Sequence, residues 1–113
     1  MVDDDEAVRL VTYEMLDRLG FEVSTAADGA SALEQASHHS FDLVLLDLVM
    51  PTMSGAEVYN LLRERDATAR VIFMTGYSPD DLGDLLTDDA TTGVLSKPFP
   101  MHELKSSVES MLT

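Results

Sequence analysis

The chain of 113 residues contains no cysteine and no tryptophan, and only seven of its residues are lysine or arginine. Without cysteine, neither a disulfide framework nor a thiolate metal site is available. No apolar run approaches the ~20 residues that a membrane-spanning helix needs. The acidic first residues, Met1 to Asp5, do not form a secretory signal peptide. We therefore expect a cytoplasmic protein domain that makes no membrane contact.

Positive charge is scarce, whereas 21 aspartates and glutamates give the chain a formal net charge of −14. Phosphate groups repel such a chain, so we expect no binding to nucleic acid. Cations and basic protein surfaces are the partners that this charge favours. Most of the carboxylates serve solubility, but those that cluster near the ends of expected strands need a further explanation.

Apolar residues make up 45% of the chain, and the length suits one domain over 1–113 with a core of its own. Apolar residues at helical spacing, with caps or glycine at the ends, predict several helices. These are expected over 8–19, 28–38, 54–62 and 101–111, and Ser78-Pro79-Asp80-Asp81 predicts the start of another. Short apolar runs predict strands at 21–25, 43–46, 71–74 and 94–96.

Apolar strands that alternate with amphipathic helices predict an α/β fold in which helices cover both faces of a parallel sheet. Only Met1 and Val2 precede the first aspartates, so about three residues of the first strand are absent relative to a typical strand. We interpret the chain as a fragment of a longer protein whose preceding residues complete this strand. The alternative is a short natural start, tolerated through dimerisation or looser packing.

Chemically useful side chains follow the apolar strands. Asp3 and Asp4 follow the short first strand, Asp47 the third, Thr75 the fourth and Lys97 the fifth. The carboxyl ends of strands in a doubly wound sheet gather functional groups at one edge. Three carboxylates there would repel one another, and Mg²⁺, which prefers hard oxygen ligands, would relieve this repulsion.

A carboxylate at such an edge can accept a phosphoryl group and form an acyl phosphate. The metal would neutralise phosphoryl oxygens, Lys97 would add positive charge, and Thr75 would donate a hydroxyl hydrogen bond. Taken singly, the aspartates are explained equally well as a helix start or a loop cap. Alone, Thr75 is more often an ordinary strand-end residue and Lys97 more often a surface charge. Their combination predicts a phosphoryl-acceptor site.

Five stretches resemble the receiver domain of two-component response regulators, and they span the chain in the order and spacing of that family. They are Val2-Asp3-Asp4-Asp5-Glu6-Ala7-Val8-Arg9, Asp42-Leu43-Val44-Leu45-Leu46-Asp47-Leu48-Val49-Met50-Pro51, Met53-Ser54-Gly55, Met74-Thr75-Gly76-Tyr77 and Leu95-Ser96-Lys97-Pro98-Phe99. The resemblance implies a flavodoxin-like (βα)₅ doubly wound parallel sheet of strand order 2-1-3-4-5, here with a truncated first strand.

The resemblance also implies a Mg²⁺ site. Asp47 matches the phosphoacceptor, which also binds the metal. Asp4 matches a direct ligand, and Asp3 matches a ligand or a partner that acts through water. The backbone carbonyl of Val49 matches the remaining protein ligand.

For the phosphorylated state, the resemblance implies that Lys97 pairs with the phosphoryl group on Asp47 and that Thr75 is the switch hydroxyl. Val94 stands where many receivers carry the tyrosine or phenylalanine that swings inward on activation. We therefore expect a response of the backbone and loops, centred on the segment 78–111, without a large side-chain swing.

The implied phosphodonor is a histidine kinase or a histidine phosphotransfer protein, and phosphorylation on Asp47 would switch protein–protein contacts in a phosphorelay. The stretch 77–81 is similar to receivers at the C-terminus of hybrid sensor histidine kinases. Such a domain promotes its own phosphoryl transfer and dephosphorylation without being an independent enzyme. No output domain follows in this sequence. A second copy of the chain, in a homodimer, is a further candidate partner.

Two alternatives compete with this interpretation. A haloacid-dehalogenase-like phosphatase also uses an aspartate at a strand end, but it places a second acid two residues later, where this chain has Val49. A receiver-like interaction module that is never phosphorylated becomes plausible if the short first strand disturbs the site. No ligand-spaced carboxylate accompanies His38, His39 or His102, so we expect all three at the surface.

Overall fold

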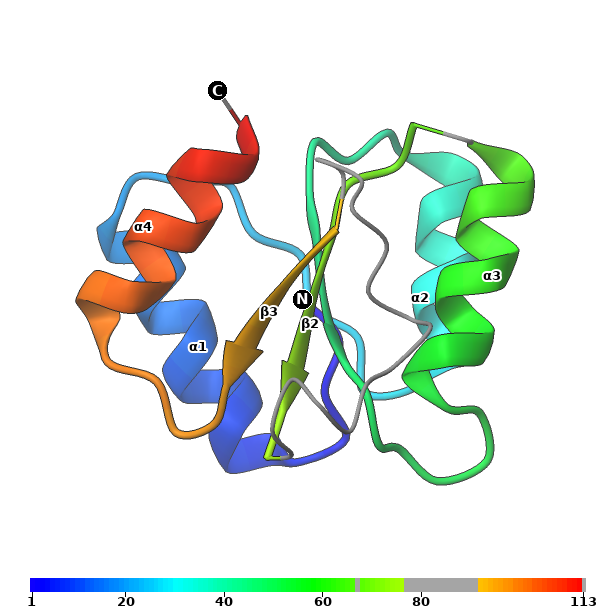
Figure 1. Cartoon of the computed structure of the whole chain (residues 1–113). Coiled ribbons are helices and arrows are strands. Elements are labelled where there is room, and N and C mark those ends of the chain that lie inside the picture. The colour runs from blue at the N-terminus through cyan, green and yellow to red at the C-terminus, as the bar shows by residue number, and fades with distance from the viewer. Residues whose placement is uncertain (67, 77–91, 113) are drawn as a thin grey trace.

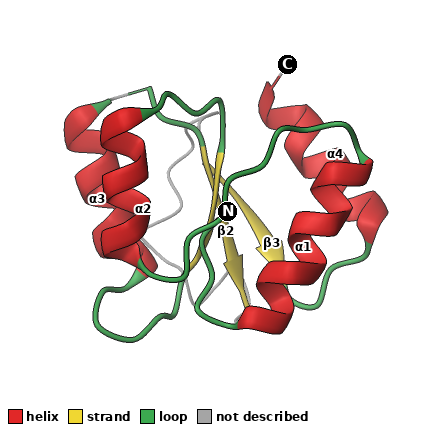
Figure 2. Ribbon diagram, turned by 180° about the vertical axis from the view of Figure 1, so that it is seen from behind, coloured by secondary structure: helices red, strands yellow, loops and turns green. Residues whose placement is uncertain are grey.

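The computed structural model describes residues 1–66, 68–76 and 92–112, and these form a parallel sheet between two pairs of helices (Figures 1 and 2). In chain order the elements are α1 (Glu6–Arg18), α2 (Gly29–His38), β1 (Val44–Asp47), α3 (Gly55–Arg65), β2 (Val71–Thr75), β3 (Thr92–Ser96) and α4 (Met101–Leu112). Helices α1 and α4 cover one face of the sheet, and α2 and α3 cover the other. The expected helix start at 78–81 lies outside the described residues.

The sheet has three parallel strands in the order β1-β2-β3. All five residues of β2 are buried, as expected for a central strand with helices on both faces. Alternate side chains divide between two apolar clusters. Phe73 packs with Val58 of α3 on one face, whereas Ile72 packs with Leu104 of α4 on the other. The predicted α/β architecture with a buried parallel sheet is confirmed.

Side-chain caps explain where the helices begin. The Asp5 carboxylate accepts hydrogen bonds from the backbone N–H groups of Ala7 and Val8, so α1 starts at Glu6, two residues before the first apolar residue of its pattern. Asp28 and Ser54 cap α2 and α3 in the same way.

Within the described part of the chain, no helix has the length and apolar character that crossing a lipid bilayer requires.

The strand predicted at 21–25 is wrong, because this segment forms no ladder in the described structure. Its partner would be the N-terminal segment, of which only Val2 pairs, through single parallel bridges to Ala26 and to Leu46. The N–H of Val2 donates to the Leu45 carbonyl (2.7 Å), and the Val2 carbonyl accepts from the Asp47 N–H (2.9 Å). Val2 thus lies between Ala26 and Leu46 of β1, and the first strand is reduced to the two single bridges that this one residue makes.

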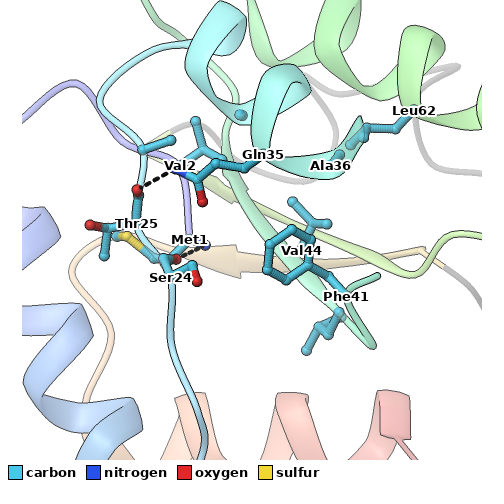
Figure 3. Close-up of a pocket in the computed structure, with 12 residues that line it drawn as sticks. Met1, Val2, Ser24, Thr25, Gln35, Ala36, Phe41, Val44 and Leu62 are labelled. Carbon is cyan, nitrogen blue, oxygen red and sulfur yellow. Dashed lines mark hydrogen bonds between the residues drawn. The ribbon is translucent and has the colours of Figure 1, made fainter. Parts of the chain in front are cut away.

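A small pocket lies beside this short segment, with Thr25 and Gln35 on one side and Phe41 and Val44 on the other (Figure 3). Its volume of about 40 Å³ is room for little more than a water molecule. The ammonium group of Met1 donates to the Ser24 carbonyl (3.0 Å), and burial lowers the pKa of this group to about 6. The terminal amine therefore lies partly desolvated at a position where a longer strand would carry a peptide N–H.

Extending the chain with about four apolar, β-branched residues ahead of Val2 should raise the midpoint of urea unfolding. The added strand would give backbone partners to 21–25 and 43–45 and would replace the desolvated ammonium. The expected gain is about 2 kcal/mol. An extension of equal length made of glycine and serine is the matched control. Equal midpoints for the two extended chains would contradict this account of the sheet.

Candidate functional site

The strand ends converge on one open cleft of about 420 Å³ at the carboxyl edge of the sheet. Asp47 is the last residue of β1, Thr75 is the last residue of β2, and Lys97 follows β3 directly. The N-terminal segment brings in Asp3 and Asp4 after the Val2 bridge. The residues that line the cleft are Asp3, Asp4, Asp5, Asp47, Val49, Thr75, Gly76 and Lys97. All six residues that the sequence singled out for the site therefore lie together.

Three carboxylates of this cleft lie close enough to share one cation. One oxygen each from Asp3, Asp4 and Asp47 lies within 4.8 Å of the others. Asp3 is fully buried and Asp47 is 6% exposed, whereas Asp4 faces solvent. Because every donor in this set is a carboxylate oxygen, the site suits a hard divalent cation such as Mg²⁺.

Lys97 bridges the two buried acids. Its Nζ lies 2.8 Å from Oδ2 of Asp3 and 3.2 Å from Oδ1 of Asp47, and its side chain is 23% exposed. The backbone N–H of Lys97 also donates to the Thr75 carbonyl (2.7 Å), which ties the end of β3 to the end of β2. The ammonium group is therefore held in a fixed position between the carboxylates.

The cleft holds a cluster of three carboxylates and one ammonium group, and two of these groups have shifted pKa values. Burial, followed by repulsion from Asp3, raises the pKa of Asp47 to about 6, although the contact with Lys97 acts in the opposite direction. Burial acts to lower the pKa of Lys97, but its hydrogen bonds to Asp3 and Asp47 outweigh this effect and raise it. The site holds more negative charge than its own lysine neutralises.

The loop that follows β1 is folded tightly against Asp47. The Val49 N–H donates to Oδ1 of Asp47 (3.4 Å), and the Gly55 N–H donates to the Leu48 carbonyl (2.9 Å). A Cβ atom on Gly55 would collide with the backbone carbonyl of Asp47. Only glycine lets the start of α3 approach β1 so closely, and the sequence analysis did not assign this role to Gly55.

Arg9 is a second residue that the sequence analysis missed. It lies in α1, and its Nη1 donates to the backbone carbonyl of Asp3 (2.9 Å). The sequence does indicate that an arginine shortly after an acidic helix start can reach back over the helix cap. It does not indicate which atom the arginine contacts, because an acidic segment offers several acceptors of similar strength.

Two further expectations concern side chains outside the acidic cluster. Val94 is half-buried and packs on the Phe73 side of the sheet, so no aromatic ring occupies this position. His38, His39 and His102 are exposed, which confirms the prediction that they lie at the surface.

In Mg²⁺-free buffer, Asp47→Asn should stabilise the domain at pH 7.5 but not at pH 4. The raised pKa means that folded Asp47 holds its proton more tightly than the unfolded chain, so the wild type loses stability as pH rises from about 4 to about 6. Asparagine has no such proton, and the gain at pH 7.5 should be on the order of 2 kcal/mol.

Urea midpoints at both pH values measure this effect, and Asp42→Asn, which changes an exposed aspartate, is the control. A difference between wild type and Asp47→Asn that is independent of pH would contradict the assigned electrostatics.

Comparisons with known proteins give a consistent result. A family model described as the response regulator receiver domain matches residues 1–109. The chain is 33% identical over 112 residues to the response regulator receiver protein CpdR of Brucella abortus, a match that covers 99% of this chain and 93% of CpdR. It is 36% identical over 114 residues to the sensor kinase CckA of the same organism, but that match spans 12% of CckA.

Solved structures agree in fold. The response regulator protein TrrA of Thermotoga maritima, in complex with Mg²⁺ and BeF, superposes with a TM-score of 0.86 at 35% identity. This match covers 98% of the present chain and 95% of the TrrA chain.

Proposed function

Since the chain belongs to the family of response regulator receiver domains, we propose that it accepts a phosphoryl group on Asp47 and signals through changed protein contacts. Receiver domains are phosphorylated on an aspartate, bind Mg²⁺ through an acidic cluster, and interact with histidine kinases or phosphotransfer proteins. The residues that perform these functions in this chain are part of the proposal.

The observation that carries the proposal is the unequal use of the carboxylate oxygens. Both side-chain oxygens of Asp3 are engaged, Oδ1 by the Asp5 N–H (2.9 Å) and Oδ2 by Lys97 (2.8 Å). Asp47 uses only Oδ1, and its Oδ2 has no hydrogen-bond partner among the described residues. Asp47 is thus the carboxylate that Lys97 holds in place while one oxygen stays available as a nucleophile.

The reaction follows from this geometry. A side-chain oxygen of Asp47 attacks the phosphorus of a phosphohistidine, a P–O bond forms, the P–N bond breaks, and the released imidazole takes up a proton. Lys97 lies beside Asp47 and can pair with a phosphoryl oxygen. Thr75, buried at the end of β2, is proposed to donate its hydroxyl to another phosphoryl oxygen.

Asp3, Asp4 and Asp47, together with the backbone carbonyl of Val49, are proposed to hold Mg²⁺. The close spacing of the three carboxylates and the all-oxygen donor set support this assignment. Asp3 is expected to act through water, because both of its carboxylate oxygens already accept hydrogen bonds. A bound metal supplies positive charge that offsets the negative charge of the phosphoryl oxygens.

The wider assignments belong to the same proposal. We expect 1–113 to act as one receiver domain in the cytoplasm, to promote its own phosphorylation and dephosphorylation without independent enzyme activity, and to leave nucleic acid unbound. A homodimer stays open. The similarity to the receiver domain of the hybrid histidine kinase CckA supports a receiver from a hybrid kinase. The stretch 77–81 that suggested one lies outside the described residues.

The two alternatives find little support. A phosphatase of the dehalogenase kind would need an acid at Val49, whose apolar side chain is 57% exposed at the rim of the cleft. An unphosphorylated module would follow if the short first strand displaced the acids. The Val2 bridges and the contact of Lys97 with Asp3 instead keep the buried acids together.

Asp47→Asn should abolish the mass gain of one phosphoryl group that the wild-type chain shows with acetyl phosphate and Mg²⁺. The substitution removes the nucleophilic oxygen, and the urea midpoint of the variant shows whether it is folded under the conditions of labelling. Intact-mass spectrometry is the measurement, with Asp42→Asn as the control. Undiminished labelling of Asp47→Asn would refute the assignment.

A further inference from the structure

The backbone of Asp3, at the start of the acidic loop, is held by an arginine that lies outside the cleft lining. Nη1 of Arg9 donates to the Asp3 carbonyl (2.9 Å), six residues back in the chain, and the side chain is half-buried. We propose that Arg9 is a positioning residue for the cation site, acting through the peptide unit that joins Asp3 to Asp4. This inference rests on the Mg²⁺ site proposed above.

Every oxygen of Asp3 has its own donor. Oδ1 accepts from the Asp5 N–H, Oδ2 accepts from Lys97, and the backbone carbonyl accepts from Arg9. The Asp3 N–H in turn donates to the Ala26 carbonyl (3.2 Å). Asp3 is therefore a fixed anchor, and Arg9 is the one contact among the described residues that holds its carbonyl.

The carbonyl matters because it belongs to the same planar peptide unit as the Asp4 nitrogen. Fixing the direction of this carbonyl fixes the plane of the unit, and the hydrogen bond from the Asp5 N–H to Oδ1 of Asp3 holds the next peptide unit. With the backbone held on both sides, the direction in which the Asp4 side chain leaves it is set. Asp4 itself is exposed and forms a bend between the Val2 bridge and the start of α1. Its carboxylate has no hydrogen-bond partner among the described residues, so its direction depends on the backbone.

The location of Arg9 suits this role. Asp5 caps α1, and Arg9 lies one turn further along the same helix, so its side chain reaches back past the cap to Asp3. The helix and the acidic loop are thereby joined by a contact that does not pass through the short first strand. In a chain whose first strand pairs through Val2 alone, this contact keeps the loop in register with Asp47.

Charge and positioning predict opposite effects of removing Arg9. A guanidinium group beside the acids repels Mg²⁺, so charge alone predicts tighter Mg²⁺ binding when Arg9 is replaced by a neutral residue. Positioning predicts weaker binding, because Asp4 loses its preferred direction. Outer contacts that orient metal ligands typically contribute 10- to 100-fold to affinity.

The test compares Arg9→Gln with Arg18→Gln by calorimetric titration of Mg²⁺ alone. Arg18 is exposed in the last turn of the same helix, so the control makes the same change of charge far from the cleft. We expect Arg9→Gln to weaken Mg²⁺ binding about tenfold and Arg18→Gln to leave it within about twofold. Urea unfolding in EDTA reports separately on any loss of fold stability, which should not account for the change in affinity.

The outcomes are distinguishable. If the wild type binds no Mg²⁺, the proposed cation site itself fails. If the wild type binds Mg²⁺ and Arg9→Gln binds it equally well or more tightly, the positioning role of Arg9 is overturned while the site stands. If Arg9→Gln does not fold, Arg9→Lys takes its place, since it keeps the charge but shortens the reach to the carbonyl. Wild-type affinity in Arg9→Lys would then overturn the inference.

Discussion

The ammonium group of Lys97, held between the carboxylates of Asp3 and Asp47, is the contact on which the site depends. It joins residues 94 positions apart in the chain and links the N-terminal segment to the ends of β1 and β3. Two buried carboxylates this close would otherwise repel each other strongly, because both are screened from water. The ammonium group of Lys97 therefore both stabilises the folded chain and stands ready beside the carboxylate of Asp47.

The same contact leaves the site incomplete in charge. Burial, and to a smaller extent the nearness of Asp3, raises the pKa of Asp47 to about 6 despite the contact with Lys97. A divalent cation between Asp3, Asp4 and Asp47 would supply what is missing, and a phosphoryl group on Asp47 would then meet positive charge from two directions. A cluster of closely spaced carboxylates beside one lysine is well suited to a domain that responds to phosphorylation.

Much of the fold and of the candidate site could be predicted from the sequence, because buried parallel strands are apolar runs and their ends carry the polar residues. Asp47, Thr75 and Lys97 each follow such a run, which is why their convergence was predictable. The apolar pattern at 21–25 did not predict correctly whether a strand forms there. Its residues have strand-like composition, but a strand needs a partner, and among the described residues only Val2 pairs with this part of the chain, through its bridge to Ala26. The bond from Arg9 was equally hidden, because it ends on a backbone carbonyl that no side-chain pattern marks.

The central claim is that one carboxylate of three, that of Asp47, becomes phosphorylated. Borohydride reduction after treatment with acetyl phosphate and Mg²⁺ converts an aspartyl phosphate to homoserine, which tandem mass spectrometry can locate in the sequence. The account predicts homoserine at position 47 and unmodified aspartate at Asp3 and Asp4. Homoserine at either of those two positions, with Asp47 unmodified, would contradict it.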